Sequence, residues 1–147
     1  IYGHFKIRLE HLFLKLPPKK VAILRLPMVF GVPSPRLNEL KLHLELDVPI
    51  ELFPNLIINV ISDRKFTQQL HYIINRNKYG IFHVGSKDLV HHDEFIKNLV
   101  SKIGAKNPKY KLVYTTNDEQ YLAVLPKENI LPKHLLMYSL ELFDSLF

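Results

Sequence analysis

The sequence predicts an α/β fold in which helices cover a parallel sheet. Segments with helical periodicity alternate with short apolar runs, in the order helix, strand, helix, strand, helix, strand, helix. Strands separated by helices pair in parallel, and a nearly continuous apolar run is typical of a strand buried on both faces. With 147 residues, of which 47% are hydrophobic, the chain is long enough for one domain with its own core.

Prolines bound the first two predicted elements. Residues 2–16 have the spacing of an amphipathic helix, and Pro17-Pro18 ends it because proline lacks the backbone N–H that a helix needs. Residues 21–26 are almost entirely apolar and predict a buried strand that ends at Pro27.

The next segments alternate between loop, helix and strand. A loop rich in proline over residues 31–35 precedes a predicted helix over 36–46, in which leucine recurs at helical spacing. A short extended piece over 50–53 follows. The apolar, β-branched run 56–61 predicts another buried strand, which only Asn59 interrupts.

A third helix is predicted to begin at Asp63, whose carboxylate can accept hydrogen bonds from the free N–H groups of the first turn. The side chains expected on its buried face are Phe66, Leu70, Ile73 and Ile74. A turn over 78–80 leads into a third strand over 81–84. After a loop, residues 92–103 have a regular apolar stripe and predict a helix that Gly104 ends.

The pattern is weaker beyond Gly104. Residues 111–115 predict an extended segment. Residues 135–147 predict a closing helix with one apolar face. There is no internal repeat and no low-complexity tract.

A phenol and an ammonium lie one helical turn apart at the start of the first helix. Tyr2 and Lys6 are at positions i and i+4 and therefore on one face. A cation beside a phenol stabilises the phenolate, which allows a tyrosine to act as an acid or a base next to a hydride-transfer cofactor. A chain with 7 tyrosines and 20 lysines and arginines can also contain such a pair by chance, so its surroundings decide.

Further landmarks follow this pair in a recognisable order. They are Leu24-Arg25 at a strand end, Phe30-Gly31, Ile61-Ser62-Asp63 before a helix, and Tyr79-Gly80-Ile81-Phe82-His83-Val84-Gly85 along a strand. With these landmarks the chain resembles the second half of an extended short-chain dehydrogenase/reductase, in the NAD-dependent epimerase/dehydratase superfamily. The segment 26–31 is most similar to the dTDP-4-dehydrorhamnose reductase branch.

The resemblance implies a function and assigns roles to single residues. It implies the C-terminal portion of a Rossmann-like parallel sheet with covering helices, plus the small substrate-binding region of a nucleotide-sugar oxidoreductase. Tyr2 would be the catalytic acid/base and Lys6 its activator, and both would also bind the cofactor, NADP or NAD. Pro27 would line the cofactor side of the site, and Met28 and Asn59 would meet the substrate. From the residues alone, an asparagine that caps backbone groups fits Asn59 at least as well.

Parts of the family pattern are missing. The five glycines form no Gly-x-Gly-x-x-Gly phosphate cradle, and the Ser/Thr that the family places upstream of the tyrosine is absent. The chain also begins with Ile1 rather than methionine. We therefore expect residues 1–147 to be a single partial domain without its N-terminal dinucleotide-binding half, and the isolated chain to be inactive.

Two other functions of the same fold stay open from the sequence. One is a sugar-nucleotide epimerase or dehydratase, although these enzymes commonly place a substrate-binding asparagine near Met28. The other is a non-catalytic, NAD(P)-binding regulatory subunit. The family also implies a homodimer through the helix 2–16, whose Ile7 and Leu14 fit ordinary core equally well.

Composition argues against several other classes of protein. The net charge is +6, but the lysines are scattered and form no basic tract interleaved with aromatics, which speaks against nucleic-acid binding. No apolar run approaches the roughly 18 residues that cross a bilayer. There is no cysteine, which suits the cytoplasm. Residues 91–94 contain metal-ligand types, but neighbouring helical residues point apart and cannot converge on one ion, so no metal site is expected.

Overall fold

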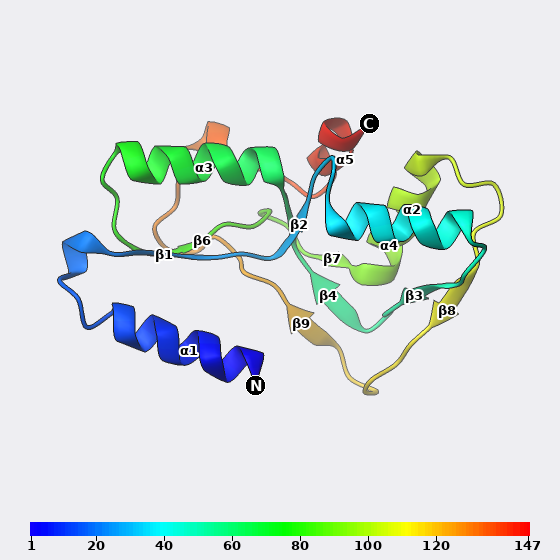
Figure 1. Ribbon diagram of the computed structural model, residues 1–147, viewed down its shortest axis with the longest axis horizontal. Helices are drawn as coiled ribbons and strands as arrows, with labels where there is room; N and C mark the ends of the chain where they lie inside the picture. Colours follow the sequence, from blue (N-terminus) through cyan, green and yellow to red (C-terminus); the bar gives the residue numbers. More distant parts are fainter.

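Parallel strand pairs form the centre of the fold, as the computed structural model shows for all residues, 1–147 (Figure 1). The parallel pairs are β1 (Ala22–Arg25) with β6 (Gly80–His83), β2 (Met28–Phe30) with β5 (Val60–Ser62), β3 (Ile50–Leu52) with β8 (Tyr110–Leu112), and β4 (Leu56–Ile58) with β9 (Gln120–Leu122). Only β7 (Val90–His91) runs antiparallel, beside β4. The predicted α/β fold with parallel strands is confirmed.

The predicted strand 56–61 is two strands that belong to different sheets. β4 pairs with β7 and β9, whereas β5 pairs with β2. Asn59 lies between them and is fully buried. The chain therefore changes sheet at the one polar residue in this apolar run.

Five α-helices and two short 3₁₀ helices complete the fold. The α-helices are α1 (Tyr2–Phe13), α2 (Pro35–Glu45), α3 (Asp63–Asn75), α4 (His92–Ile103) and α5 (Glu141–Leu146), and the 3₁₀ helices cover Pro18–Lys20 and Lys133–Leu135. α4 has the predicted bounds, and Gly104 ends it in the left-handed conformation with φ 88°. α3 begins at Asp63 as predicted, but its cap is Ser62, whose Oγ accepts a hydrogen bond from Lys65 N at 3.0 Å.

The buried face of α3 differs from the prediction at one position. Ile73 is buried, but Ile74 is 62% exposed. Gln69 is buried instead, and its Nε2 donates a hydrogen bond to the carbonyl of Leu135 at 2.7 Å. A polar side chain faces inward here because the 3₁₀ segment that packs on α3 brings a backbone carbonyl that needs a donor.

The predicted closing helix 135–147 is wrong over its first half. Only Glu141–Leu146 is α-helical. The Asp88 carboxylate accepts hydrogen bonds from Ser139 N at 2.7 Å and from Ser139 Oγ at 2.5 Å, and Met137 O accepts one from Lys87 N at 2.9 Å. These bonds tie the backbone groups of 137–139 to the loop around Asp88, so they cannot close helical turns.

The core lies between the strands and the helices α2, α4 and α5. Phe95 of α4 packs between Phe30 of β2, which is tilted against it, and Phe143 of α5, which stacks on it, with ring centroids 5.5 and 5.6 Å apart. α1 contributes no buried residue. In Figure 1 it lies on the opposite side of the β1–β6 pair from α3. It is also shorter than predicted, because residues 14–16 leave the helix.

Candidate functional site

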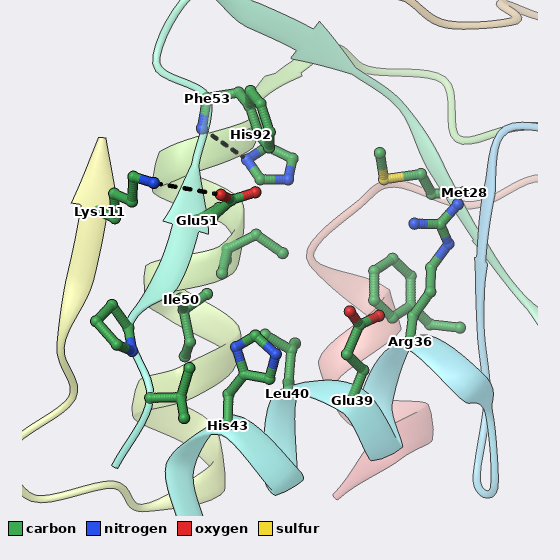
Figure 2. A pocket seen from close by; sticks show the side chains of 14 residues that line it. Met28, Arg36, Glu39, Leu40, His43, Ile50, Glu51, Phe53, His92 and Lys111 are labelled. Atoms are coloured by element: carbon green, nitrogen blue, oxygen red, sulfur yellow. Dashed lines mark hydrogen bonds and ion pairs between the residues drawn. The ribbon is translucent and has the colours of Figure 1, made fainter. Parts of the chain in front are cut away.

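The site is a pocket of about 560 Å³ between α2, β3 and the start of α4 (Figure 2). The first residues of α2 reach it because Ser34 Oγ caps the helix by accepting a hydrogen bond from Leu37 N at 3.3 Å, and Pro35 occupies the first helical position. β3 supplies the opposite wall. Fourteen residues from five segments of the chain meet around the cavity.

Charged side chains form the exposed rim of this pocket. They come from α2, β3 and β8, and are Arg36, Glu39, Glu51 and Lys111. Lys111 Nζ lies 3.9 Å from Glu51 Oε1, a long ion pair between exposed groups that is weak in water. Arg36 forms no ion pair. Arginine and lysine at the mouth of an apolar pocket can bind an anionic group such as a phosphate.

The floor of the pocket is buried and almost entirely apolar. Its apolar members are Phe30, Leu40, Ile50 and Ile96. His92 at the start of α4 is the only polar side chain among the buried residues that line the pocket, and it is 8% exposed. Charge at the rim and apolar surface below it suit a ligand with one anionic and one weakly polar part.

The protonation state of His92 follows from its contacts. Its Nδ1 accepts a hydrogen bond from the backbone N–H of Phe53 at 3.2 Å, and the Phe53 ring packs edge-on against it at 5.2 Å. Burial lowers the pKa of His92 below its ordinary value of 6.5, against the opposing effect of Asp93 and with a smaller contribution from Arg36. The ring is therefore neutral at pH 7, with its proton on Nε2.

Two predicted site residues lie at or near the pocket. Met28 of β2 lines it, as Figure 2 shows. Pro27 is half-buried in the link between β1 and β2 and is not a lining residue. Substrate contact by Met28 and cofactor contact by Pro27 stay predictions.

Tyr2 and Lys6 lie together on α1, as their spacing predicts, but outside the pocket. Lys6 Nζ is 5.3 Å from the centroid of the Tyr2 ring, a cation–π contact. Tyr2 is 75% exposed, and neither residue lines the cavity. The pair therefore presents a hydroxyl and an ammonium to one surface of α1.

An ion pair that was not predicted from the sequence joins α1 to β1. Arg25 donates from Nη2 and Nε to the two oxygens of the Glu10 carboxylate, at 2.7 and 3.0 Å, and this hydrogen-bonded pairing holds the Glu10 pKa below its ordinary value. Glu10 is at i+8 from Tyr2 and i+4 from Lys6, so all three lie on one stripe of α1. The landmark Leu24-Arg25 could have predicted an ion pair, because an arginine at the end of a buried strand needs an anionic partner.

Arg25 also contacts His83 of β6, on the neighbouring strand. Arg25 Nη1 lies 3.3 Å from His83 Nε2, and His83 Nδ1 lies 3.1 Å from the carbonyl of Leu125. Since arginine only donates and a carbonyl only accepts, these contacts fit the tautomer of His83 with its proton on Nδ1. His83 is thus a packed histidine, and it connects β1 to the C-terminal segment.

Asn59 uses its side chain to hold backbone groups. Its Nδ2 donates to the carbonyls of Ser86 and Val124 at 3.1 and 2.8 Å, and its Oδ1 accepts from Val124 N at 3.0 Å. The residue has no exposed surface. This geometry fits the backbone-capping alternative for Asn59. Substrate contact by Asn59 stays a prediction, and it would require the side chain to leave these bonds.

Two of the landmark glycines allow close approaches. A Cβ on Gly31 would lie 2.0 Å from Asp63 Oδ2, and a Cβ on Gly85 would lie 2.2 Å from Asn59 Nδ2. No side chain larger than hydrogen fits at either position without movement of its neighbour. The landmark residues Gly31 and Asp63 therefore touch each other in space.

No group of three or more histidine, cysteine, aspartate or glutamate side chains is placed to hold a metal ion. No helix combines the length and the apolar character that crossing a bilayer requires.

Solved structures share this fold over almost the whole chain. A dTDP-4-dehydrorhamnose reductase from Bacillus anthracis, in complex with NADP, is 20% identical with a TM-score of 0.76, and the match covers 97% of this chain and 51% of that one. The corresponding reductase from Clostridium acetobutylicum is 15% identical with a TM-score of 0.72, over 98% and 54%. A UDP-glucuronic acid 4-epimerase from Bacillus cereus, in complex with NAD, is 19% identical with a TM-score of 0.66, over 95% and 47%.

These likenesses confirm the resemblance at the level of the fold. The chain spans about half the length of these proteins, consistent with a C-terminal portion. No family model matches the sequence, and no curated protein matches it.

Proposed function

We propose that residues 1–147 are the substrate-binding, C-terminal half of a nucleotide-sugar oxidoreductase of the dTDP-4-dehydrorhamnose reductase type. The observation that carries this proposal is the match of 97–98% of the chain to two such reductases. Met28 stands where epimerases and dehydratases commonly place a substrate-binding asparagine, and this difference favours the reductase over those relatives.

The pocket supplies the substrate site in this proposal. A nucleotide sugar has a diphosphate between a flat base and a sugar, so it needs cations beside apolar surface. Arg36 and Lys111 stand at the rim to bind the diphosphate, and the apolar floor takes the less polar part. Met28 lines the pocket and follows β1 closely in the chain. β1 ends at Arg25, which pairs with Glu10 of α1.

Tyr2 and Lys6 supply the proton chemistry. NADPH or NADH, when bound, supplies the hydride that reduces a sugar carbonyl. The Tyr2 hydroxyl donates the proton that the carbonyl oxygen needs, and the Lys6 ammonium stabilises the phenolate that remains. The 5.3 Å contact between Lys6 Nζ and the Tyr2 ring supports this pairing.

The residues of this chain fit one side of the cofactor. Tyr2 and Lys6 expose a hydroxyl and an ammonium on one stripe, which suits the hydroxyl groups of a nicotinamide ribose. The chain contributes no glycine-rich phosphate cradle. We infer that a preceding dinucleotide-binding half holds the pyrophosphate, and that residues 1–147 alone do not turn over.

Replacement of Tyr2 in the full-length natural protein tests the proposal. Tyr2→Phe keeps the ring and removes the proton donor, so we expect NADPH-dependent reduction of dTDP-4-dehydrorhamnose to fall about 10²–10⁴-fold. NADPH affinity, measured by fluorescence titration, is expected to stay within about threefold, since one hydrogen bond is lost. The matched control is Tyr79→Phe, which changes an exposed tyrosine far along the sequence.

One outcome would contradict the role of Tyr2, and two others would contradict the reductase. Unchanged turnover in Tyr2→Phe would remove the role of Tyr2. A wild-type protein that binds NADPH and the sugar nucleotide without turnover would favour the non-catalytic subunit. Interconversion of sugar epimers without net consumption of NADPH would favour the epimerase.

A further inference from the structure

His92 has one ring nitrogen without a partner in the chain. Nδ1 accepts the Phe53 hydrogen bond, whereas Nε2 faces the cavity (Figure 2). Gln69 Oε1 is the only fully buried polar side-chain atom of the protein that has no hydrogen-bond partner. Nε2 of His92 also has no partner but is not fully buried, so it is open to the cavity. A polar group in an apolar wall is costly unless it binds a partner.

We propose that the Nε2–H of His92 donates a hydrogen bond to a ring carbonyl oxygen of a pyrimidine base and thereby selects the nucleotide that the pocket accepts. This inference rests on the proposed function, because it takes a nucleotide sugar as the occupant of the pocket.

The fixed tautomer makes His92 a permanent donor. The backbone N–H of Phe53 can only donate, so Nδ1 must carry a lone pair and the single ring proton sits on Nε2. Burial keeps the ring uncharged near neutral pH. The pocket floor therefore offers an N–H without a positive charge.

The separation of charge in the pocket sets the orientation of the ligand. Arg36 and Lys111 are exposed at the rim, while His92 lies among buried apolar side chains. A phosphate would lose much of its hydration in the floor, where no cation would replace it. A pyrimidine ring has flat apolar faces and neutral carbonyl oxygens, so it fits the floor while its diphosphate stays at the rim.

Two substitutions separate the two nitrogens of His92. In His92→Asn, the amide oxygen takes the place of Nδ1 and keeps the hydrogen bond from Phe53 N, but the pocket loses its donor. In His92→Gln, the amide nitrogen reaches the place of Nε2 and keeps the donor, but the acceptor for Phe53 N is lost. The first variant tests recognition and the second tests structure.

Isothermal titration of the full-length protein with dTDP, UDP and pyrophosphate measures the effect. We expect His92→Asn to weaken dTDP and UDP about 10-fold, since a ligand carbonyl loses its partner, and to leave pyrophosphate unchanged. His92→Gln is expected to retain nucleotide affinity within about threefold. Equal nucleotide affinity in wild type and His92→Asn would overturn the role of His92 while leaving the proposed function intact.

The wild-type titration tests the proposed function separately. If neither nucleoside diphosphate binds to the wild-type protein, the proposed function and this inference both fail. Long-range ¹H–¹⁵N spectra of labelled histidine side chains give a readout that does not depend on any variant. The Nε2 resonance of His92 should shift with dTDP and stay in place with pyrophosphate, and an unmoved resonance in the dTDP complex would overturn the contact.

Discussion

The side-chain amide of Asn59 binds both backbone groups of Val124, 65 residues further along the chain. Oδ1 accepts from the Val124 N–H at 3.0 Å, and Nδ2 donates to the Val124 carbonyl at 2.8 Å. The amide copies the hydrogen bonds of a strand neighbour at the point where β4 ends and β5 begins. It thereby joins the C-terminal segment to the place where the chain changes sheet.

Removal of the Asn59 amide is expected to destabilise the protein. Asn59→Ala leaves the N–H and carbonyl of Val124 without these partners, and we expect a loss of about 2–4 kcal/mol in the free energy of unfolding. Urea denaturation measures it. The matched control is Asn98→Ala on the exposed face of α4, for which a change within about 0.5 kcal/mol is expected. An Asn59→Ala variant as stable as this control would contradict the structural role.

Gly85 is expected to tolerate no side chain. The Cβ of Gly85→Ala would lie 2.2 Å from Asn59 Nδ2 and 2.8 Å from the Val124 carbonyl oxygen, so the Asn59 amide has to move. We expect a loss of about 1–3 kcal/mol from this overpacking, by thermal and urea unfolding. Gly3→Ala is the control, because a Cβ there meets nothing within 4 Å and alanine favours the helix. Equal effects of the two changes would contradict the close approach.

The Arg25–Glu10 pair is expected to contribute stability that is lost in acid. The Glu10 pKa is lowered in the folded protein, so the contribution is present above its ordinary value of 4.5 and is lost as pH falls through the lower folded value. A double-mutant cycle with Glu10→Gln and Arg25→Met should give a coupling free energy of about 0.5–1 kcal/mol at pH 7. The coupling should vanish at pH 2. A coupling independent of pH would exclude an ionic contact.

The lowered His92 pKa predicts a second pH dependence, with loss of stability in mild acid. The folded ring resists protonation, so its contribution is complete above the ordinary value of 6.5 and declines as pH falls from there toward the folded pKa. Asp93 opposes this shift and Arg36 adds to it. His92→Asn cannot titrate. The difference in unfolding free energy between wild type and this variant should therefore shrink between pH 8 and pH 5, and a constant difference would refute the assignment.

The sequence predicted an element well where the residues of that element contain the signals that define it. Helix α4 has an apolar stripe and a glycine stop, and its bounds were predicted to the residue. The closing segment failed because its break depends on hydrogen bonds between Asp88 and Ser139, which are 51 residues apart. No periodicity within residues 135–147 carries that information.

The candidate site was predicted only in part, because most of its residues are brought together by contacts between distant segments. The spacing of Tyr2 and Lys6 placed them correctly on one face, and Met28 proved to line the pocket. Arg36, Lys111 and His92 come from three separate segments, and nothing in their local sequence distinguishes them from ordinary surface or helix-start residues. Only the fold brings them to one cavity.

The exposed position of α1 has a consequence for motion. The helix has no buried residue, and the side-chain contact that fixes it to the strands is the Arg25–Glu10 pair. Elements with few packed contacts open first, so the amide protons of α1 should exchange with solvent much faster than those of α4. We therefore expect the segment that carries Tyr2 to be less protected than α4, and any surface that covers α1 would slow its exchange.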